Sequence, residues 1–257
     1  MIARVLIVAG SDSGGGAGIQ ADIATVAMLG GHPMTAVTAI TAQNTLGVQG
    51  VMPVPAAMVV AQIRSCVDDL GVDAVKIGMI GSAGTAHAVA DVLADVLADV
   101  GVPIVFDPVM IASSGAVLAD DATIAAFARL MALAALVTPN LPELAALGGE
   151  PAVLARAPAL LVKGGHGAGE AVVDRLVTRA GEVARWANPR IDTSSTHGTG
   201  CTLASAIATG LGQGMAPTDA VARAIAFVRA SLHHAPGLGG GHGPMGQQHA
   251  TGFRCPA

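Results

Sequence analysis

The stretch HGTGCTLASAIATGLGQG, residues 197–214, places one cysteine directly after a Gly-Thr-Gly turn and at the start of an alanine-rich helix. The backbone N–H groups of Gly198, Thr199 and Gly200 can converge at a helix N-terminus, where unpaired amides and the helix dipole favour an anion. The same field is expected to lower the pKa of the Cys201 thiol. These residue types suit phosphoryl transfer, in which the turn holds the moving group and Cys201 takes a proton from the attacking hydroxyl. The alternative is a small buried cysteine in a tight turn.

A second glycine-rich stretch, GSDSGGGAG at residues 10–18, can also present backbone N–H groups to an anion or let a substrate lie close to the chain. It does not fit the dinucleotide fingerprint G-x-G-x-x-G, because the pattern counted from Gly14 reaches Ile19 where the third glycine should stand. It is not a P-loop either, since it contains no Gly-Lys-Ser/Thr ending. The stretch therefore disfavours both a dehydrogenase and a P-loop enzyme.

The segment TPNLPE, residues 138–143, sets Asn140 and Glu143 one helical turn apart, directly after an apolar run. An amide and a carboxylate suit a hydrated Mg²⁺, which keeps most of its waters. The same residues also fit an ordinary helix start, with Pro142 and Glu143 in the first turn. The motif alone leaves both interpretations open.

The elements that must position these residues alternate along the chain as short apolar runs and helix-length amphipathic segments. Continuous apolar strands separated by helices indicate a parallel sheet buried on both faces, and hence an α/β fold. Residues 169–178 and 181–189 suggest a β-hairpin. Strands are expected at 4–10, 33–44, 74–79, 103–109, 135–140 and 159–166, and helices at 18–30, 55–71, 85–101, 120–134, 199–211 and 217–234.

Polar residues follow six of these strands, in the exits GSD, AQN, KIGM, DPVM, TPN and KGGH. Ligands of a doubly wound sheet bind beyond the carboxyl ends of its strands, so six such exits in series predict one shared cleft, although polar loops are the plain alternative. Lys76 and Lys163 stand in otherwise apolar strands, and a lysine is seldom buried without a partner. A phosphate is a credible partner for Lys163.

Composition restricts the classes of protein that this chain can be. Its 257 residues fit one large α/β domain or two small ones, and the absence of a linker predicts a single domain over residues 1–257 with a glycine-rich, partly mobile tail at 236–257. Cys255 is expected as an exposed thiol in that tail. The formal net charge of −5, the lack of a basic tract and an aromatic content of 2% disfavour nucleic acid as a partner.

The cysteines and the N-terminal segment indicate the cellular compartment. Three widely spaced cysteines without a CxxC pattern disfavour a disulfide framework or a cysteine metal site. The apolar run in MIARVLIVAG is too short for a signal sequence or a membrane span. We therefore expect a cytoplasmic protein without a membrane partner.

Seven stretches together carry a family resemblance: AGSDSGGGAGIQAD, TAQNTLGV, KIGM, DPVM, TPNLPE, VKGGH and THGTGCTLASAIA. In this order they resemble the hydroxymethylpyrimidine/phosphomethylpyrimidine kinases of thiamine biosynthesis, a branch of the ribokinase superfamily. The match runs from about residue 5 to residue 234, and THGTGCTL is its most diagnostic part. The resemblance implies a ribokinase-like, three-layer α/β/α fold, ATP as co-substrate, Mg²⁺, a small pyrimidine substrate and a homodimer.

The resemblance also implies roles for single residues. The GTGC turn resembles the anion hole of the superfamily, whose last position is an aspartate base in most sugar kinases and Cys201 here. Gln43 resembles the residue that hydrogen-bonds the aminopyrimidine, and Asp22 and Met79 resemble further residues of the pyrimidine pocket. The implied ATP and phosphate contacts are Lys163, Asn140 and Thr196, and the implied Mg²⁺ motif is Asn140 with Glu143, mostly through water.

Three functions remain to be weighed. The leading one is phosphorylation of 4-amino-5-hydroxymethyl-2-methylpyrimidine and then of its monophosphate by Mg-ATP. Pyridoxal kinase is the alternative, because both substrates are flat heteroaromatic rings with a hydroxymethyl arm. Gln43 favours the pyrimidine, since its amide can both donate and accept toward an aminopyrimidine edge. A non-catalytic ligand sensor on the same scaffold is disfavoured by the intact NxxE and GTGC motifs.

Overall fold

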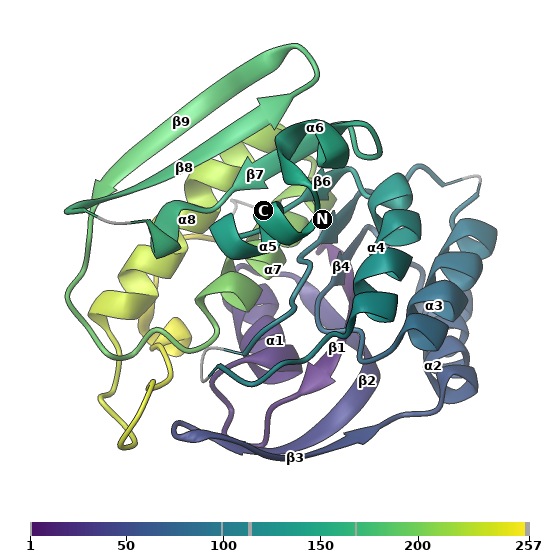
Figure 1. Ribbon diagram of the computed structural model, residues 1–257, viewed down its shortest axis with the longest axis horizontal. Helices are drawn as coiled ribbons and strands as arrows, with labels where there is room; N and C mark the ends of the chain where they lie inside the picture. The colour runs from purple at the N-terminus through teal and green to yellow at the C-terminus, as the bar shows by residue number, and fades with distance from the viewer. Residues whose placement is uncertain (1, 99, 113–114, 168, 255–257) are drawn as a thin grey trace.

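The structure is a computed structural model that describes residues 2–98, 100–112, 115–167 and 169–254. Its strands are β1 (Arg4–Ser11), β2 (His32–Asn44), β3 (Gly47–Pro53), β4 (Ala74–Ile77), β5 (Ile104–Phe106), β6 (Leu136–Val137), β7 (Ala159–Val162), β8 (Ala171–Thr178) and β9 (Gly181–Pro189). Within the described ranges they form one nine-stranded sheet in the order β3-β2-β1-β4-β5-β6-β7-β8-β9 (Figure 1). The strands from β2 to β7 are parallel, and β3, β8 and β9 pair antiparallel.

Strand β1 shows why the centre of the sheet is apolar on both faces. Successive side chains of a strand point to opposite faces. Leu6 and Val8 accordingly enter the core on one side of the sheet, while Val5 and Ile7 enter the core on the other. A continuous apolar run is therefore what this position requires, and the prediction of a doubly wound α/β fold is confirmed.

Helices cover both faces of the sheet and complete the three layers (Figure 1). One core holds residues from α2 (Ala56–Leu70), α3 (Ala83–Val96), α4 (Asp121–Leu133), α5 (Leu141–Ala146) and α6 (Gly149–Leu154). The other holds residues from α1 (Gly18–Met28), α7 (Thr199–Gly212) and α8 (Pro217–His233). Among the described helices, none combines the length and the apolar character that crossing a membrane requires.

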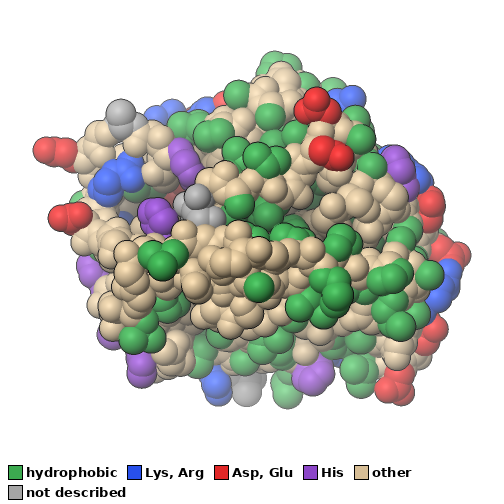
Figure 2. Space-filling view, turned by 60° about the horizontal axis from the view of Figure 1, so that its bottom comes forward, with side chains coloured by type: hydrophobic (Ala, Val, Ile, Leu, Met, Phe, Trp, Pro, Cys, Tyr) green, Lys and Arg blue, Asp and Glu red, His purple; other side chains and the backbone are tan. Residues whose placement is uncertain are grey.

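The edge strand β3 is the main element that the sequence pattern does not predict. It pairs antiparallel with β2, and most of its residues are exposed, so it lacks the apolar alternation of a half-buried strand. Figure 2 turns this edge toward the reader and shows hydrophobic side chains scattered over it, with charged groups mostly at the periphery. Exposed apolar side chains of β2, β3 and the turn between them are Ile40, Leu46, Val51 and Met52.

Several predicted strands end earlier than expected, and this matters for the site. Strand β5 ends at Phe106, β6 at Val137 and β7 at Val162, and the last is followed by a short 3-10 turn, η1 (Gly164–His166). The exits DPVM, TPN and KGGH therefore lie beyond the strands, whereas AQN is the end of β2. Loops leave their side chains and amides free to face a ligand.

The C-terminal tail packs on the body of the protein over much of its length. Gln247, in the 3-10 turn η2 (Gln247–His249), is buried and donates to Thr202 Oγ1 at 3.1 Å. Phe253 meets Phe227 edge to face, with ring centroids 5.5 Å apart. Mobility of residues 236–257 stays a prediction, and Cys255 lies outside the described residues.

Candidate active site

A cavity of about 850 Å³ opens beyond the carboxyl ends of the parallel strands. All six polar strand exits contribute to its wall, which confirms the prediction of one shared cleft. Its lining includes the following predicted site residues: Gln43, Met79, Asn140, Glu143, Lys163, Thr196, Gly198, Thr199, Gly200 and Cys201.

Asp22 is the predicted site residue that the structure does not place in the cavity wall. It is fully buried on α1, where Oδ2 accepts from Lys76 Nζ at 2.7 Å and Oδ1 accepts from Ser205 Oγ at 2.7 Å. Lys76 itself lines the cavity, so Asp22 lies behind it. The structure thus places Asp22 outside the cavity wall and against Lys76, and its part in the pyrimidine pocket stays a prediction.

The Gly-Thr-Gly turn forms the N-terminus of α7. Gly198 is the N-cap residue, with φ of +80°, and a Cβ at this position would lie 2.0 Å from the carbonyl oxygen of Gly16. Only glycine fits such a left-handed, crowded position. The first N–H groups of a helix lack acceptors within the helix, so amides of this turn can face a ligand where Thr199 and Gly200 line the cavity. The Thr199 N–H makes only a long bond, at 3.4 Å, to the Thr196 carbonyl. Such a wall suits an anion, and we call residues 198–200 the anion turn.

The Cys201 thiol differs from expectation in its acidity. Burial raises its pKa to about 11, and the nearby Lys76 ammonium and a hydrogen bond from the Gly18 backbone only partly oppose that shift. The carboxylates of Asp22 and Asp107 raise the pKa further. The predicted lowering of the pKa is thus wrong, because desolvation is the largest cause and outweighs the groups that lower the pKa. Cys201 is a neutral thiol near pH 7.

A lysine and two carboxylates lie beside the turn. Lys163 Nζ donates to Asp107 Oδ1 at 2.6 Å and lies 3.9 Å from Glu143 Oε2. Burial alone would lower the Lys163 pKa, but Asp107 and Glu143 raise it, so the ammonium is charged. A Cβ at Gly200 would lie 3.3 Å from Lys163 Nζ and 3.4 Å from Asp107 Oδ2, so this cluster flanks the anion turn. Asp107 stands in the strand exit DPVM but was not among the predicted site residues.

Asn140 and Glu143 form a reciprocal cap at the start of α5. Asn140 Oδ1 accepts from the Glu143 backbone N–H at 2.9 Å, and Glu143 Oε2 accepts from the Asn140 backbone N–H at 2.8 Å. The capping interpretation is therefore correct, but it does not exclude the metal interpretation, since both residues also line the cavity. Among the described residues, no group of three His, Cys, Asp or Glu could hold a metal directly. Oxygens already used for capping fit a Mg²⁺ held through its water shell.

Two further predicted residues have simpler surroundings. The sulfur of Met79 lies against the glycine-rich stretch at residues 10–18, the first glycine loop, and is 3.0 Å from where a Cβ of Gly10 would stand. The backbone carbonyl of Met79 accepts from Thr38 Oγ1 at 2.7 Å. Thr196 Oγ1 lies 3.3 Å from His242 Nδ1, and its carbonyl accepts from Thr199 N at 3.4 Å. Met79 thus forms part of the cavity wall beside β1, and the Thr196 carbonyl contacts the anion turn through Thr199.

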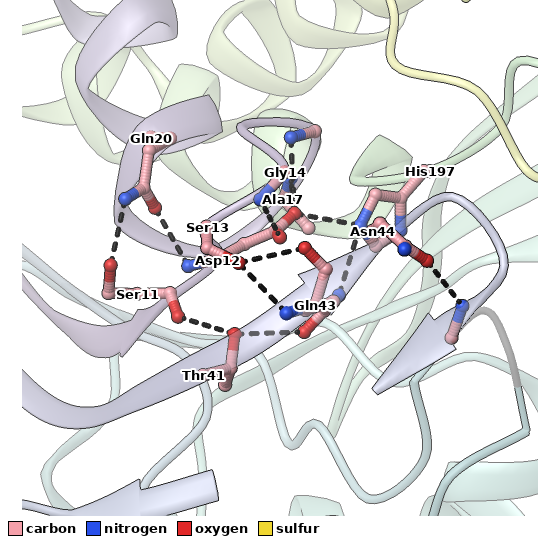
Figure 3. A network of polar contacts seen from close by, with 12 residues as sticks. Ser11, Asp12, Ser13, Gly14, Ala17, Gln20, Thr41, Gln43, Asn44 and His197 are labelled. Carbon is pink, nitrogen blue, oxygen red and sulfur yellow. Dashed lines mark hydrogen bonds and ion pairs between the residues drawn. The ribbon is translucent and has the colours of Figure 1, made fainter. Parts of the chain in front are cut away.

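A polar network joins the first glycine loop to β2 and to the anion turn (Figure 3). Asp12 Oδ2 lies 2.8 Å from His197 Nε2, and the same ring nitrogen lies 3.1 Å from Gln43 Nε2. Asp12 and His197 were not among the predicted site residues, although both stand in the quoted motifs. The signal that could have found them is their position, each directly at a glycine turn.

Comparisons with known proteins agree with this geometry. A family model described as phosphomethylpyrimidine kinase matches residues 12–246. The hydroxymethylpyrimidine/phosphomethylpyrimidine kinase of Streptomyces coelicolor is 46% identical over 96% of this chain and 95% of that protein. The protein of the same name from Rhizobium meliloti is 45% identical over 97% of this chain and 98% of that protein.

Solved structures of two kinds of kinase share the fold. The pyridoxal kinase of Staphylococcus aureus in complex with pyridoxal superposes with a TM-score of 0.87 at 26% identity, over 99% of this chain and 96% of that one. The phosphomethylpyrimidine kinase of Clostridium difficile does so with a TM-score of 0.75 at 34% identity, over 89% of this chain and 98% of that one. Backbone similarity alone therefore does not separate the two substrates.

Proposed function

The chain belongs to the phosphomethylpyrimidine kinase family, and on that premise we propose that it phosphorylates 4-amino-5-hydroxymethyl-2-methylpyrimidine and then the monophosphate, in thiamine biosynthesis. ATP is the phosphoryl donor. The observation that carries the proposal is one cavity that holds an anion turn, a thiol, a lysine–carboxylate cluster and a side-chain amide. The turn would hold the moving phosphoryl group, and Cys201 would stand beside the substrate hydroxyl.

Lys163 supports a phosphate site despite its carboxylate partner. An ammonium group has three N–H donors, and Asp107 takes one of them at 2.6 Å. Glu143 Oε2 at 3.9 Å is too far for a second strong bond. A phosphate oxygen bound at the turn can therefore take a remaining N–H without breaking the Asp107 pair.

Turnover of ATP with each ring compound tests the assignment directly. We expect phosphorylation of the hydroxymethylpyrimidine and of its monophosphate at kcat/KM well above that for pyridoxal. The higher identity to hydroxymethylpyrimidine/phosphomethylpyrimidine kinases favours this order, while the likeness to pyridoxal kinases makes pyridoxal the necessary comparison. A higher kcat/KM with pyridoxal would reverse the assignment, and binding without turnover of any ring would favour a sensor.

Oligomeric state and compartment belong to the same proposal. We expect a homodimer, and the exposed apolar side chains along β2 and β3 support a protein contact at that edge. Light scattering of the purified chain measures it. We also expect the protein to act in the cytoplasm, where ATP is available.

The Glu143 carboxylate should matter through Mg²⁺. Mg²⁺ would neutralise phosphate charge during transfer, and the capped Asn140–Glu143 pair would hold its waters. Glu143→Gln keeps an oxygen for the cap but removes the charge, so we expect lower turnover at low Mg²⁺ and partial recovery at high Mg²⁺. Initial rates over a Mg²⁺ titration measure this effect. Full activity in excess chelator would remove the metal from the proposal.

Gln43 should contribute to binding the ring rather than ATP. Losing one hydrogen bond while its buried partner stays unsatisfied costs about 1–3 kcal/mol. Gln43→Ala should therefore raise the KM for the pyrimidine roughly tenfold or more, with the KM for ATP nearly unchanged. Steady-state kinetics with each substrate varied in turn measure both values. An equal defect for ATP would mean that Gln43 supports the fold of the loop instead.

A further inference from the structure

We propose that His197 is a positioning residue that turns the side-chain amide of Gln43, so that Gln43 offers an N–H donor to the substrate ring. This inference rests on the proposed function, because it concerns how the same cavity recognises its ring. The ring that fits carries an unprotonated nitrogen as hydrogen-bond acceptor. The protonation state of Asp12 decides which atom of His197 carries a hydrogen.

Asp12 is an ionised acceptor held by four donors (Figure 3). Its Oδ1 accepts from Gly14 N at 2.8 Å, and its Oδ2 accepts from Gly16 N at 3.1 Å and Ala17 N at 2.8 Å. His197 Nε2 lies 2.8 Å from the same Oδ2. Burial alone would raise the Asp12 pKa, but the bonds from His197, Ala17 and Gly14 outweigh it and hold the pKa below its usual value. A carboxylate only accepts, so His197 Nε2 carries the hydrogen.

This assignment conflicts with the rotamer in which Gln43 Nε2 faces His197 Nε2 at 3.1 Å. A ring nitrogen that bears a hydrogen has no lone pair left, so two N–H groups would face each other. A half-turn of the amide removes the conflict, because it exchanges the oxygen and nitrogen positions. The oxygen then shares the single Nε2 hydrogen of His197 with Asp12 Oδ2 in a three-centre bond, and the nitrogen faces Thr41 Oγ1 at the 3.4 Å position. Thr41 can accept there, because its own hydrogen goes to the Ser11 carbonyl at 2.9 Å.

The turned amide determines what the cavity offers to a ligand. One amide hydrogen is directed to Thr41, which leaves the second for the cavity that Gln43 lines. The oxygen is committed to His197. Gln43 therefore presents a donor, and its partner on the substrate is a ring nitrogen lone pair rather than an amino group.

The surroundings of His197 keep its ring in place for this task. The residue is buried, its backbone N–H donates to the Gly243 carbonyl at 3.1 Å, and its Cδ2 lies 2.5 Å from where a Cβ of Gly16 would stand. Glycine at position 16 is thus needed for the ring to reach Asp12. The tail, through Gly243, and the first glycine loop together hold the imidazole beside Gln43.

Two substitutions at His197 test whether the residue acts by donating a hydrogen bond to Gln43 or only by its side-chain volume. His197→Leu removes the N–H, so the amide of Gln43 is free to turn. We expect binding of the hydroxymethylpyrimidine to ATP-free enzyme to weaken roughly tenfold by calorimetry, with the KM for ATP changed by less than about twofold. His197→Gln places an NH₂ group near the Nε2 position, which can serve both Asp12 and the Gln43 oxygen, and should restore most of the affinity. Equal weakening by Leu and Gln would overturn the proposal.

Gln43→Glu supplies an independent test that does not disturb His197. A carboxylate keeps an acceptor for His197 but has no donor for the ring, so we expect a loss of ring binding as large as that of Gln43→Ala. Retained binding would mean that the oxygen of Gln43 faces the ring, and would overturn the proposal. In the Gln43→Ala background, His197→Leu should add little, because interacting residues are not additive.

Matched controls keep these outcomes distinct. His87, which is exposed on α3, gives the control His87→Leu, and thermal unfolding of every variant reports on the fold. A full additional tenfold loss in the Gln43→Ala background would make His197 structural and contradict the proposal. Wild-type enzyme that fails to bind the pyrimidine would instead contradict the proposed function, so the two failures differ.

Discussion

Replacing Cys201 with alanine should lower kcat by about 10²–10⁴-fold, the usual contribution of a positioned proton acceptor, with little change in either KM. The residue lines the cavity at the N-terminus of α7, directly after the amides that would hold the phosphoryl group. Only the transfer step needs a group that removes the hydroxyl proton, so substrate binding should survive. Single-turnover and steady-state rates measure the loss. Wild-type turnover by Cys201→Ala would reduce the cysteine to a small packing residue.

The pH dependence of kcat adds a sharper test of the same role. Because burial raises the Cys201 pKa to about 11, the thiolate that accepts a proton is a minor species at neutral pH. The thiolate fraction grows about tenfold per pH unit below that pKa, so wild-type kcat should rise with pH across the range 7 to about 10. An aspartate starts from a much lower pKa than a cysteine, so even with the same burial any activity of Cys201→Asp should show a weaker slope.

Alkylation supplies the control for this pH profile. A thiol reagent should inactivate the free enzyme faster as pH rises, and bound ATP with pyrimidine should protect it. Cys66, on α2, is partly buried and outside the cavity wall, so Cys66→Ala should leave the inactivation unchanged. A wild-type kcat that does not change with pH would contradict the role of Cys201 as proton acceptor. The anion turn would then contribute by positioning and charge alone.

The fold could be predicted from the sequence because its signals are local. Continuous apolar runs such as that around Val5 and Ile7 are buried on both faces of the sheet, and the glycine after α1 marks the end of a helix. The hairpin of β8 and β9 likewise agrees with the two predicted strand-length segments on either side of residues 179–180. Strand β3 was not predicted, because an exposed edge strand does not require alternating apolar and polar residues.

The site was only partly predictable, because its chemistry depends on depth and on partners distant in sequence. The strand exits indicated the cleft, but Asp107 becomes a site residue only through Lys163, 56 positions later in the chain. His197 and Asp12 meet across 185 positions. Burial raises the Cys201 pKa, and the local sequence shows the helix N-terminus but not how deeply the thiol is buried. Asp22 shows the same limit, since a motif names a residue but not whether it faces the cavity.

The second large effect concerns Asp22 and Lys76, a fully buried ion pair beneath the cavity. Both side chains have an exposed fraction of 0% and their charged atoms lie 2.7 Å apart. Burial alone would lower the Lys76 pKa, but Asp22, Cys201 and Asp107 raise it above its usual value, so the ammonium stays charged. Removing one partner of such a pair leaves an uncompensated buried charge, which costs about 3–5 kcal/mol.

Asp22→Ala should therefore lower the free energy of unfolding by about 3–5 kcal/mol, roughly a fifth or more of the stability of an ordinary domain. Urea denaturation measures the shift. Should the variant not fold, Asp22→Asn keeps an acceptor for Lys76 and should show a smaller loss of the same sign. Combining Asp22→Ala with Lys76→Met removes both charges and should recover much of the stability, because an apolar pair is often no worse than a buried ion pair.

The exposed pair of Arg64 and Asp95 is the matched control for this prediction. Its charged atoms are also 2.7 Å apart, but the side chains are 46% and 65% exposed. Water screens such a pair, so Asp95→Ala should cost no more than about 1 kcal/mol. Equal losses from Asp22→Ala and Asp95→Ala would mean that Lys76 finds another partner or loses its proton when Asp22 is gone. A large loss from Asp22→Ala that Lys76→Met relieves would instead show that Asp22 neutralises the buried Lys76 ammonium, and this would explain an aspartate in the motif that lies outside the cavity wall.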